Sequence, residues 1–151
     1  MARVLIVGCG CRGQALTRAL VTDGHPVRGT TRSRERFADI ERAGAEPYLG
    51  DPDRIVTLMD ALAAVTAVVW LLGEADAPDL HAGRLRMLCE KIVDTPVRGL
   101  VYEASERFPE GREIVADAAQ RWLIPTATVR PKMDTGGILA ALDSLQILQS
   151  R

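Results

Sequence analysis

The segment VLIVGCGCRG, residues 4–13, constrains the fold of this chain more than any other stretch. It opens with the apolar run Val4–Val7, which is typical of a strand buried on both faces of a sheet. Glycines then follow in the pattern G-x-G-x-x-G, at Gly8, Gly10 and Gly13. Apolar residues at helical spacing come next, so the segment predicts a strand, a glycine-rich turn and a helix in direct succession.

Each glycine of this turn has a distinct physical task when such a turn binds a nucleotide. Gly8 permits the tight turn, Gly10 lets the backbone approach a pyrophosphate, and Gly13 lets the helix pack close to the strand. The N–H groups at the helix start and the helix dipole favour a bound diphosphate. A glycine-rich turn without any ligand is the less favoured alternative. The residues of the turn that we expect to contact a nucleotide are Gly8, Gly10, Cys11, Arg12 and Gly13.

The rest of the chain alternates between short apolar runs and segments with helical spacing. Strands are expected at 4–7, 25–31, 46–49, 67–72, 98–102 and 126–129, and helices after Gly13, at 34–43, around 55–62, and at 79–93, 110–122 and 138–149. A helix in every gap is the crossover that parallel strands need. The prediction is a doubly wound, three-layer α/β sheet of six parallel strands, in the Rossmann order 3-2-1-4-5-6.

Length and composition narrow the class of protein. The 151 residues suit one domain, expected to span 1–151, and a formal net charge of -1 gives no electrostatic argument for nucleic acid or an anionic membrane. The longest mainly apolar stretch, 61–72, is too short to span a membrane. Cys9 and Cys11 lack further ligands at a recognisable spacing, so no metal site is expected. We expect a cytoplasmic protein with reduced thiols and with neither a nucleic-acid nor a membrane partner.

The end of the second expected strand bears on the choice of nucleotide. An NAD-binding chain of this type usually carries an acidic residue about 20 positions after the turn, where it binds the ribose hydroxyls. Here the strand ends in Thr31, Arg32 and Ser33, with no acid. Guanidinium groups suit a 2′-phosphate better than a diol, and Arg12 is expected to reach the same place, so NADP(H) is favoured over NAD(H). The alternative is that Arg32 is simply solvated, in a chain with seventeen arginines and two lysines.

Six segments resemble the short-chain dehydrogenase/reductase superfamily, in particular its extended and atypical branches, which include epimerase-like and NmrA-like proteins. They are VLIVGCGCRG, RGTTRS, AGAEPYLGD, AVVWLLG, RGLVYEAS and TATVRP, and they cover the chain to about Pro131. The resemblance implies that Asp51 contacts the adenine side of a cofactor, although Asp51 is also a suitable cap for the following helix. It further implies that Leu71, Leu72 and Gly73 line the cofactor, that Glu103 and Ser105 lie beside the nicotinamide, and that Arg130 closes the site.

The chain departs from that superfamily where the chemistry is concerned. The superfamily's usual proton donor is the tyrosine of a Y-x-x-x-K motif, but neither Tyr48 nor Tyr102 is followed by lysine four residues on. Only weak candidates for a catalytic role remain, with a solvated loop or a structural role as their alternative. These candidates are Ser105, Glu103 and His81.

Two functions follow from these observations, and the sequence leaves both open. The first is an NADPH-dependent reductase that passes hydride to a small acceptor such as a quinone, a flavin or an activated carbonyl or alkene. The second is a non-catalytic NADP(H)-binding redox sensor or regulatory module, which the missing tyrosine and the short chain favour. Apolar residues along the last expected helix, 138–149, predict packing on the sheet or burial in a homodimer.

Overall fold

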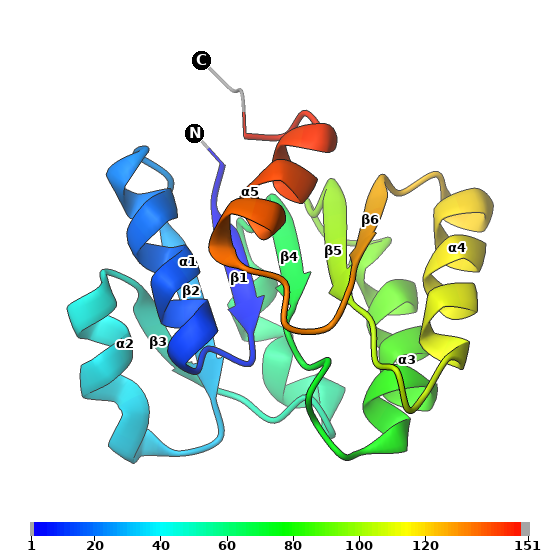
Figure 1. Cartoon of the computed structure of the whole chain (residues 1–151), viewed down its shortest axis with the longest axis horizontal. Coiled ribbons are helices and arrows are strands. Elements are labelled where there is room, and N and C mark those ends of the chain that lie inside the picture. Colours follow the sequence, from blue (N-terminus) through cyan, green and yellow to red (C-terminus); the bar gives the residue numbers. More distant parts are fainter. Residues whose placement is uncertain (1, 149–151) are drawn as a thin grey trace.

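The computed structural model describes residues 2–148, and its six strands form one parallel sheet (Figure 1). The strand order is β3-β2-β1-β4-β5-β6, which confirms the expected Rossmann arrangement. The strands are β1 (Val4–Val7), β2 (Val27–Thr31), β3 (Glu46–Leu49), β4 (Ala67–Trp70), β5 (Gly99–Glu103) and β6 (Thr126–Val129). Because all six run in the same direction, their carboxyl ends meet at one edge of the sheet, where sheets of this kind bind ligands.

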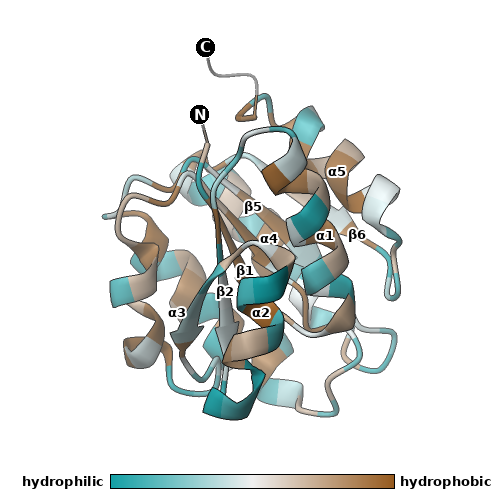
Figure 2. Ribbon diagram, turned by 90° about the vertical axis from the view of Figure 1, so that its left-hand side faces the viewer, coloured by the Kyte–Doolittle hydropathy of each residue, from teal (hydrophilic) through white to brown (hydrophobic). Residues whose placement is uncertain are grey.

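Helices cover both faces of the sheet, so the fold has three layers (Figure 2). On one face lie α1 (Cys11–Thr22), α2 (Phe37–Ala43) and α5 (Thr135–Ser144). On the other face lie α3 (Gly83–Ile92) and α4 (Glu110–Trp122). Two short 3-10 turns, Arg34–Arg36 and Pro78–His81, lead into α2 and towards α3.

The two faces of each central strand contribute to two separate apolar cores. Along β1, Leu5 and Val7 pack into the core beneath α3 and α4, whereas Val4 and Ile6 pack beneath α1. All four side chains are fully buried. A strand that is covered on both sides needs apolar residues at every position, which is why the run Val4–Val7 shows no polar alternation.

The helix ends carry the local signals that the sequence contains. Ser33 caps the turn before α2, since its hydroxyl accepts a hydrogen bond from the N–H of Glu35 at 3.3 Å. Gly44 ends α2 with a φ of +108°, a left-handed conformation that favours glycine. Asp134 begins α5 by accepting a hydrogen bond from the N–H of Gly137 at 2.8 Å.

The third crossover differs from the expected α-helix around 55–62. Its residues form two 3-10 turns, Ile55–Leu58 and Asp60–Leu62, although their apolar side chains are buried in the core as expected. The hydroxyl of Thr57 donates to the carbonyl oxygens of Asp51 and Arg54, at 3.1 and 2.7 Å. Such side-chain bonds to the local backbone compete with α-helical pairing, and they account for the tighter turns.

The apolar residues of the C-terminal segment are used in the core. Ile138 and Leu142, on α5, are almost completely buried in the same core as β1, and so are Ile147 and Leu148 after the helix ends at Ser144. The expected helix over 138–149 therefore starts and stops earlier, and Gln149 lies outside the described residues. Among residues 2–148, no helix is long and apolar enough to cross a membrane.

The first turn of α4 offers a test of this packing. A Cβ added at Gly111 would overlap the hydroxyl oxygen of Tyr102, a fully buried side chain of β5. We expect Gly111→Ala to lower the free energy of unfolding by about 1–3 kcal/mol, because neither β5 nor α4 can move freely in a close-packed core.

The matched control is Gly136→Ala in the first turn of α5, where a new Cβ would meet only an Asp134 oxygen at 3.8 Å. This change should leave stability unchanged or raise it by up to about 1 kcal/mol. Urea denaturation of both variants measures the difference. Equal stabilities would contradict the described contact between α4 and Tyr102.

Candidate cofactor site

The glycine-rich turn after β1 lies at the carboxyl edge of the sheet, between β2 and β4. Gly8 has a φ of +89°, a backbone conformation that disfavours any residue with a side chain. In addition, a Cβ at this position would lie only 2.8 Å from the carbonyl oxygen of Leu71. A Cβ on Gly13 would lie 3.2 Å from Ile6 and from the Cys9 sulfur, which shows how closely α1 packs on β1. At Gly10 a Cβ would meet no atom within 4 Å. The turn therefore presents bare backbone to open space at Gly10.

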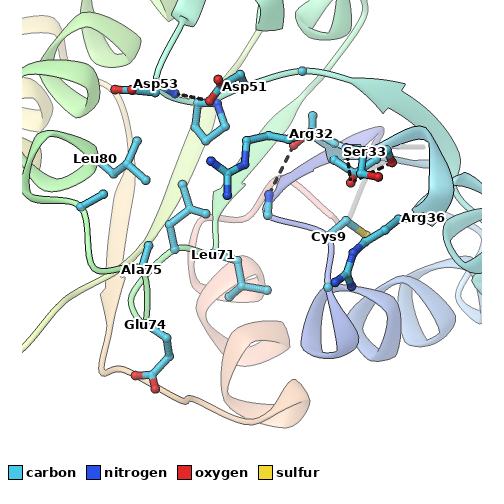
Figure 3. A pocket seen from close by; sticks show the side chains of 18 of the residues that line it. Cys9, Arg32, Ser33, Arg36, Asp51, Asp53, Leu71, Glu74, Ala75 and Leu80 are labelled. Carbon is cyan, nitrogen blue, oxygen red and sulfur yellow. Dashed lines mark hydrogen bonds between the residues drawn. The ribbon is translucent and has the colours of Figure 1, made fainter.

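A cavity of about 630 Å³ opens beside this turn (Figure 3). Its walls come from the turn itself, the ends of β2 and β3, and the loop that follows β4. Of the residues that the sequence indicated as cofactor contacts, the cavity is lined by Gly8, Gly10, Thr31, Arg32, Ser33, Asp51, Leu71 and Leu72. Eight predicted positions that are scattered over 65 residues of sequence thus line one space.

The end of β2 supplies the basic side of the cavity. Thr31 and Ser33 shape the backbone here, because the N–H of Ser33 donates to the Thr31 hydroxyl at 3.2 Å. The Arg32 side chain extends towards the middle of the cavity, and Arg36 extends towards the first turn of α1 (Figure 3). Both arginines are exposed. No salt bridge occupies either of them among the described residues.

Arg36 was not among the residues indicated by the sequence. The available signal was that Arg36 follows the same strand end closely, in the short 3-10 turn Arg34–Arg36. Arg34 lies between them in sequence, but its guanidinium stacks over the Phe37 ring at 5.8 Å and it does not line the cavity. The cavity thus selects two of the three arginines in this segment.

Asp51 lies on the opposite wall of the cavity from the glycine-rich turn. Its carboxylate accepts a hydrogen bond from the N–H of Asp53 at 2.9 Å and so stabilises the turn after β3. Asp51 therefore has the capping role that the sequence allowed, although it caps a turn and not an α-helix. It also lines the cavity.

Arg12 does not point to the end of β2, contrary to the expectation that it meets a 2′-phosphate together with Arg32. Its two terminal nitrogens contact the two carboxylate oxygens of Glu103, at 2.8 and 2.6 Å, in a bidentate pair. Arg12 also donates to the carbonyl oxygen of Met133 at 3.3 Å. A fully buried carboxylate draws the guanidinium across the sheet edge towards β5, away from Arg32.

Glu103 is engaged in hydrogen bonds on both oxygens. Besides the hydrogen bond and the second ion-pair contact from Arg12, one oxygen accepts from the N–H of Gly73 at 2.7 Å and the other from the N–H of Lys132 at 2.9 Å. A Cβ on Gly73 would lie 2.6 Å from the Glu103 side chain, so a glycine is needed after β4. Glu103 joins the ends of three strands, and its environment is that of a positioning residue.

His81 is buried and hydrogen-bonded at both ring nitrogens. Nε2 lies 3.0 Å from the carbonyl oxygen of Leu72, which can only accept, so Nδ1 accepts from the Tyr102 hydroxyl at 2.5 Å. Burial lowers the pKa of His81, and this effect outweighs the opposing influence of the Leu72 carbonyl and of the carboxylates of Glu103 and Glu110. Burial likewise raises the pKa of Tyr102. The neutral pair links the loop after β4 to β5.

The remaining indicated residues lie outside the cavity walls. Ser105 is buried and its hydroxyl accepts from the N–H of Arg107 at 3.2 Å, while Arg130 is exposed. Cys11 is exposed at the start of α1, whereas Cys9 is buried, which raises the pKa of its thiol to about 11. The cysteine that could react is therefore Cys11 rather than Cys9. Whether any of these residues contacts a cofactor stays a prediction.

The geometry described so far defines a class of protein: a six-stranded Rossmann sheet with a glycine-rich turn and a cavity at its switch point, between β1 and β4. A family model described as NAD(P)H-binding matches residues 8–103, which is more than half of the chain. The chain therefore belongs to this NAD(P)H-binding family. The match starts at the first glycine of the turn and ends at Glu103.

Solved structures with the same fold include members of the superfamily that the sequence resembles. A short-chain dehydrogenase/reductase superfamily protein from Agrobacterium tumefaciens, solved with NAD bound, matches 85% of this chain with a TM-score of 0.68 and 23% identity. Triphenylmethane reductase from a Citrobacter species, solved with NADP(H), matches 85% with a TM-score of 0.68 and 16% identity. Vestitone reductase from alfalfa matches 85% with a TM-score of 0.71 and 11% identity.

The chain spans only part of the length of these proteins. It covers 48% of the Agrobacterium and Citrobacter structures and 56% of vestitone reductase. A curated relative, the uncharacterized protein C2A9.02 of Schizosaccharomyces pombe, is 34% identical over 68 residues, which are 44% of this chain and 23% of that protein. These likenesses establish the fold. The Agrobacterium protein was solved with NAD and the Citrobacter reductase with NADP(H), so the solved structures do not decide which of the two cofactors this chain binds.

The buried histidine predicts a pH dependence of stability. Because the pKa of His81 is lower in the folded chain than the usual 6.5, the unfolded chain binds a proton more readily once the pH falls below about 6.5. Above that pH, the titration of His81 does not change the free energy of unfolding. Below it, the titration lowers the free energy of unfolding by at most about 1.4 kcal/mol for each pH unit.

Urea denaturation between pH 7.5 and pH 5.5 measures this effect in the wild type and in His81→Gln, which cannot titrate. The loss of stability on acidification should be smaller in the variant than in the wild type. Identical losses in the two proteins would show that His81 is not the group responsible.

Proposed function

We propose that this chain is an NADP(H)-binding protein that recognises the 2′-phosphate of the cofactor at the end of β2. The observation that carries this proposal is the pair Arg32 and Arg36 on the cavity wall, at a strand end that bears no acid. A diol-binding site needs a carboxylate acceptor at this place, whereas a phosphate is matched by guanidinium donors. The acids of the cavity follow other strands instead: Asp51 and Asp53 come after β3, and Glu74 and Asp76 come after β4.

The rest of the cavity suits the adenosine diphosphate part of such a cofactor. Gly10 leaves space for the pyrophosphate above the start of α1, whose free N–H groups attract an anion. Leu71 and Leu80 supply apolar surface for the adenine, opposite the basic end of β2. When the cofactor is bound, any redox chemistry would use the hydride of its nicotinamide.

We infer that the role of this binding is regulatory. Among the described residues near the expected nicotinamide, Glu103 and His81 already bond to protein groups on every polar atom, and the Ser105 hydroxyl is buried and accepts from a backbone N–H. A proton donor for an alcohol or ketone would have to be free to face a substrate. The arrangement therefore favours a module that binds NADP(H) and presents the bound state to a partner.

The second candidate function is an NADPH-dependent reductase. Acceptors such as quinones, flavins and activated alkenes take their proton from water, so they need no donor from the protein. The fold likeness to triphenylmethane reductase, which was solved with NADP(H), favours this candidate. It requires that the nicotinamide reach an acceptor at the ends of β4 and β5.

Alanine substitutions in the segment after β2 test the recognition of the 2′-phosphate. Arg32→Ala and Arg36→Ala should each weaken NADP⁺ binding by about 1–3 kcal/mol, because each removes a charge-assisted hydrogen bond, and should hardly change NAD⁺ binding. Arg34→Ala is the matched control, since Arg34 stacks on Phe37 outside the cavity. Isothermal titration calorimetry gives the affinities. Equal losses for both cofactors would show that these arginines do not read the 2′-phosphate.

Absorbance of reduced nicotinamide separates the regulatory role from the reductase. The purified protein is mixed with NADPH and a panel of quinones and flavins, and the rate of NADPH oxidation is compared with that of the same mixture without protein. A regulatory module binds NADPH but leaves the rate at background. Oxidation above background that rises with protein concentration would favour the reductase.

A further inference from the structure

The residues around Glu103 restrict which part of a dinucleotide this site can bind. We propose that the site recognises the 2′-phosphorylated adenosine diphosphate part of its ligand alone, and that the Arg12–Glu103 ion pair closes the part of the cleft where a nicotinamide would lie. The ligand class is then any nucleotide with this common part, whatever it carries beyond the diphosphate. This inference rests on the proposed NADP(H) binding, and it adds which part of the cofactor the site contacts.

The extent of the cavity is the first support. Every residue of its wall lies between Gly8 and Leu80, so it is built from the ends of β1, β2 and β3 and the loop after β4. Among residues 2–148, none of the wall comes from the end of β5, where Glu103 and Ser105 lie, or from the segment after β6. In a sheet with this order, the second half of a dinucleotide lies over those two strands. The open space therefore covers only the first half.

The second support is what fills the place over β5 and β6. The Arg12 side chain leaves the glycine-rich turn, crosses this edge and pairs with Glu103, whose side chain is fully buried. The backbone N–H groups of Gly73 and Lys132 hold the same carboxylate from the two flanking strand ends. The Arg12 side chain is about a third exposed, but it is the only cation paired with this buried carboxylate among the described salt bridges, so its displacement by a ligand would leave Glu103 with backbone partners alone.

The loops above this pair are tied together as well. Lys132, after β6, lies 3.7 Å from the carboxylate of Glu74 on the loop after β4. Arg107, after β5, lies 2.9 Å from the carboxylate of Asp76 on the same loop. Each exposed pair contributes little by itself, but both draw the loop after β4 over the same region. The loop thus borders the cavity and is also joined to the segments that follow β5 and β6.

A matched pair of ligands tests this inference. NADP⁺ and 2′-phospho-ADP-ribose differ only by the nicotinamide ring, and calorimetry on the wild-type chain gives both affinities. We expect dissociation constants within about threefold of each other. Binding of NADP⁺ more than about tenfold tighter than that of 2′-phospho-ADP-ribose would overturn the inference, because the ring would then contribute contacts. Binding of neither ligand would overturn the proposed function instead.

Removal of the ion pair provides a second test. In Arg12→Ala/Glu103→Ala no charge is left unpaired, and the space over β5 becomes available to a nicotinamide. The preference for NADP⁺ over 2′-phospho-ADP-ribose should rise at least about fivefold, while Glu46→Gln, which removes the half-exposed partner of Arg28 at the far end of the sheet, should leave it unchanged. An unchanged preference in a double variant that melts cooperatively would contradict the assignment of Arg12 and Glu103. The wild-type comparison stands by itself if the double variant does not fold.

Discussion

The buried carboxylate of Glu103 is the interaction on which the ligand edge of this molecule depends. A charge in the interior of a protein is tolerated only when it is paired and hydrogen-bonded, and Glu103 meets this condition through its ion pair with Arg12 and two hydrogen bonds from backbone N–H groups. These partners come from α1 and from the ends of β4 and β6. One side chain therefore sets the relative positions of four elements at the carboxyl edge of the sheet.

The same interaction divides the cleft into two unequal parts. On the side of β2 and β3, a cavity remains open between the glycine-rich turn, two arginines and the loop after β4. On the side of β5 and β6, buried His81 and Tyr102 are hydrogen-bonded to each other, whereas buried Glu103 is paired with Arg12 and accepts from the backbone N–H groups of Gly73 and Lys132. The division explains why the cavity is confined to the side of β2 and β3. It also explains why the polar residues near β5 bind protein atoms.

The parts of the structure that the sequence predicted are those set by local pattern. Val4–Val7 and the three glycines after it were enough for the strand, the turn and the helix, and the alternation of apolar runs was enough for the strand order. The third crossover failed as an α-helix because the Thr57 hydroxyl bonds to nearby carbonyl oxygens, a choice that hydrophobic spacing does not reveal.

The contacts that the sequence could not predict are those between distant side chains. Arg12 and Glu103 are 91 residues apart, and His81 and Tyr102 are 21 apart, so no spacing rule brings either pair together. The sequence predicts Arg12 beside a phosphate at the end of β2 because a guanidinium near a glycine-rich turn suits one. Its true neighbour depends on a carboxylate that the sheet order alone places across the edge.

A crystal structure of the protein grown with NADP⁺ tests the account most directly, because it locates both halves of the cofactor relative to the ion pair. The account predicts the 2′-phosphate between Arg32 and Arg36, the diphosphate over Gly10, and Arg12 still paired with Glu103, with the nicotinamide outside the region of β5 and β6. A nicotinamide ring seated against Glu103, with Arg12 displaced from it, would contradict the account.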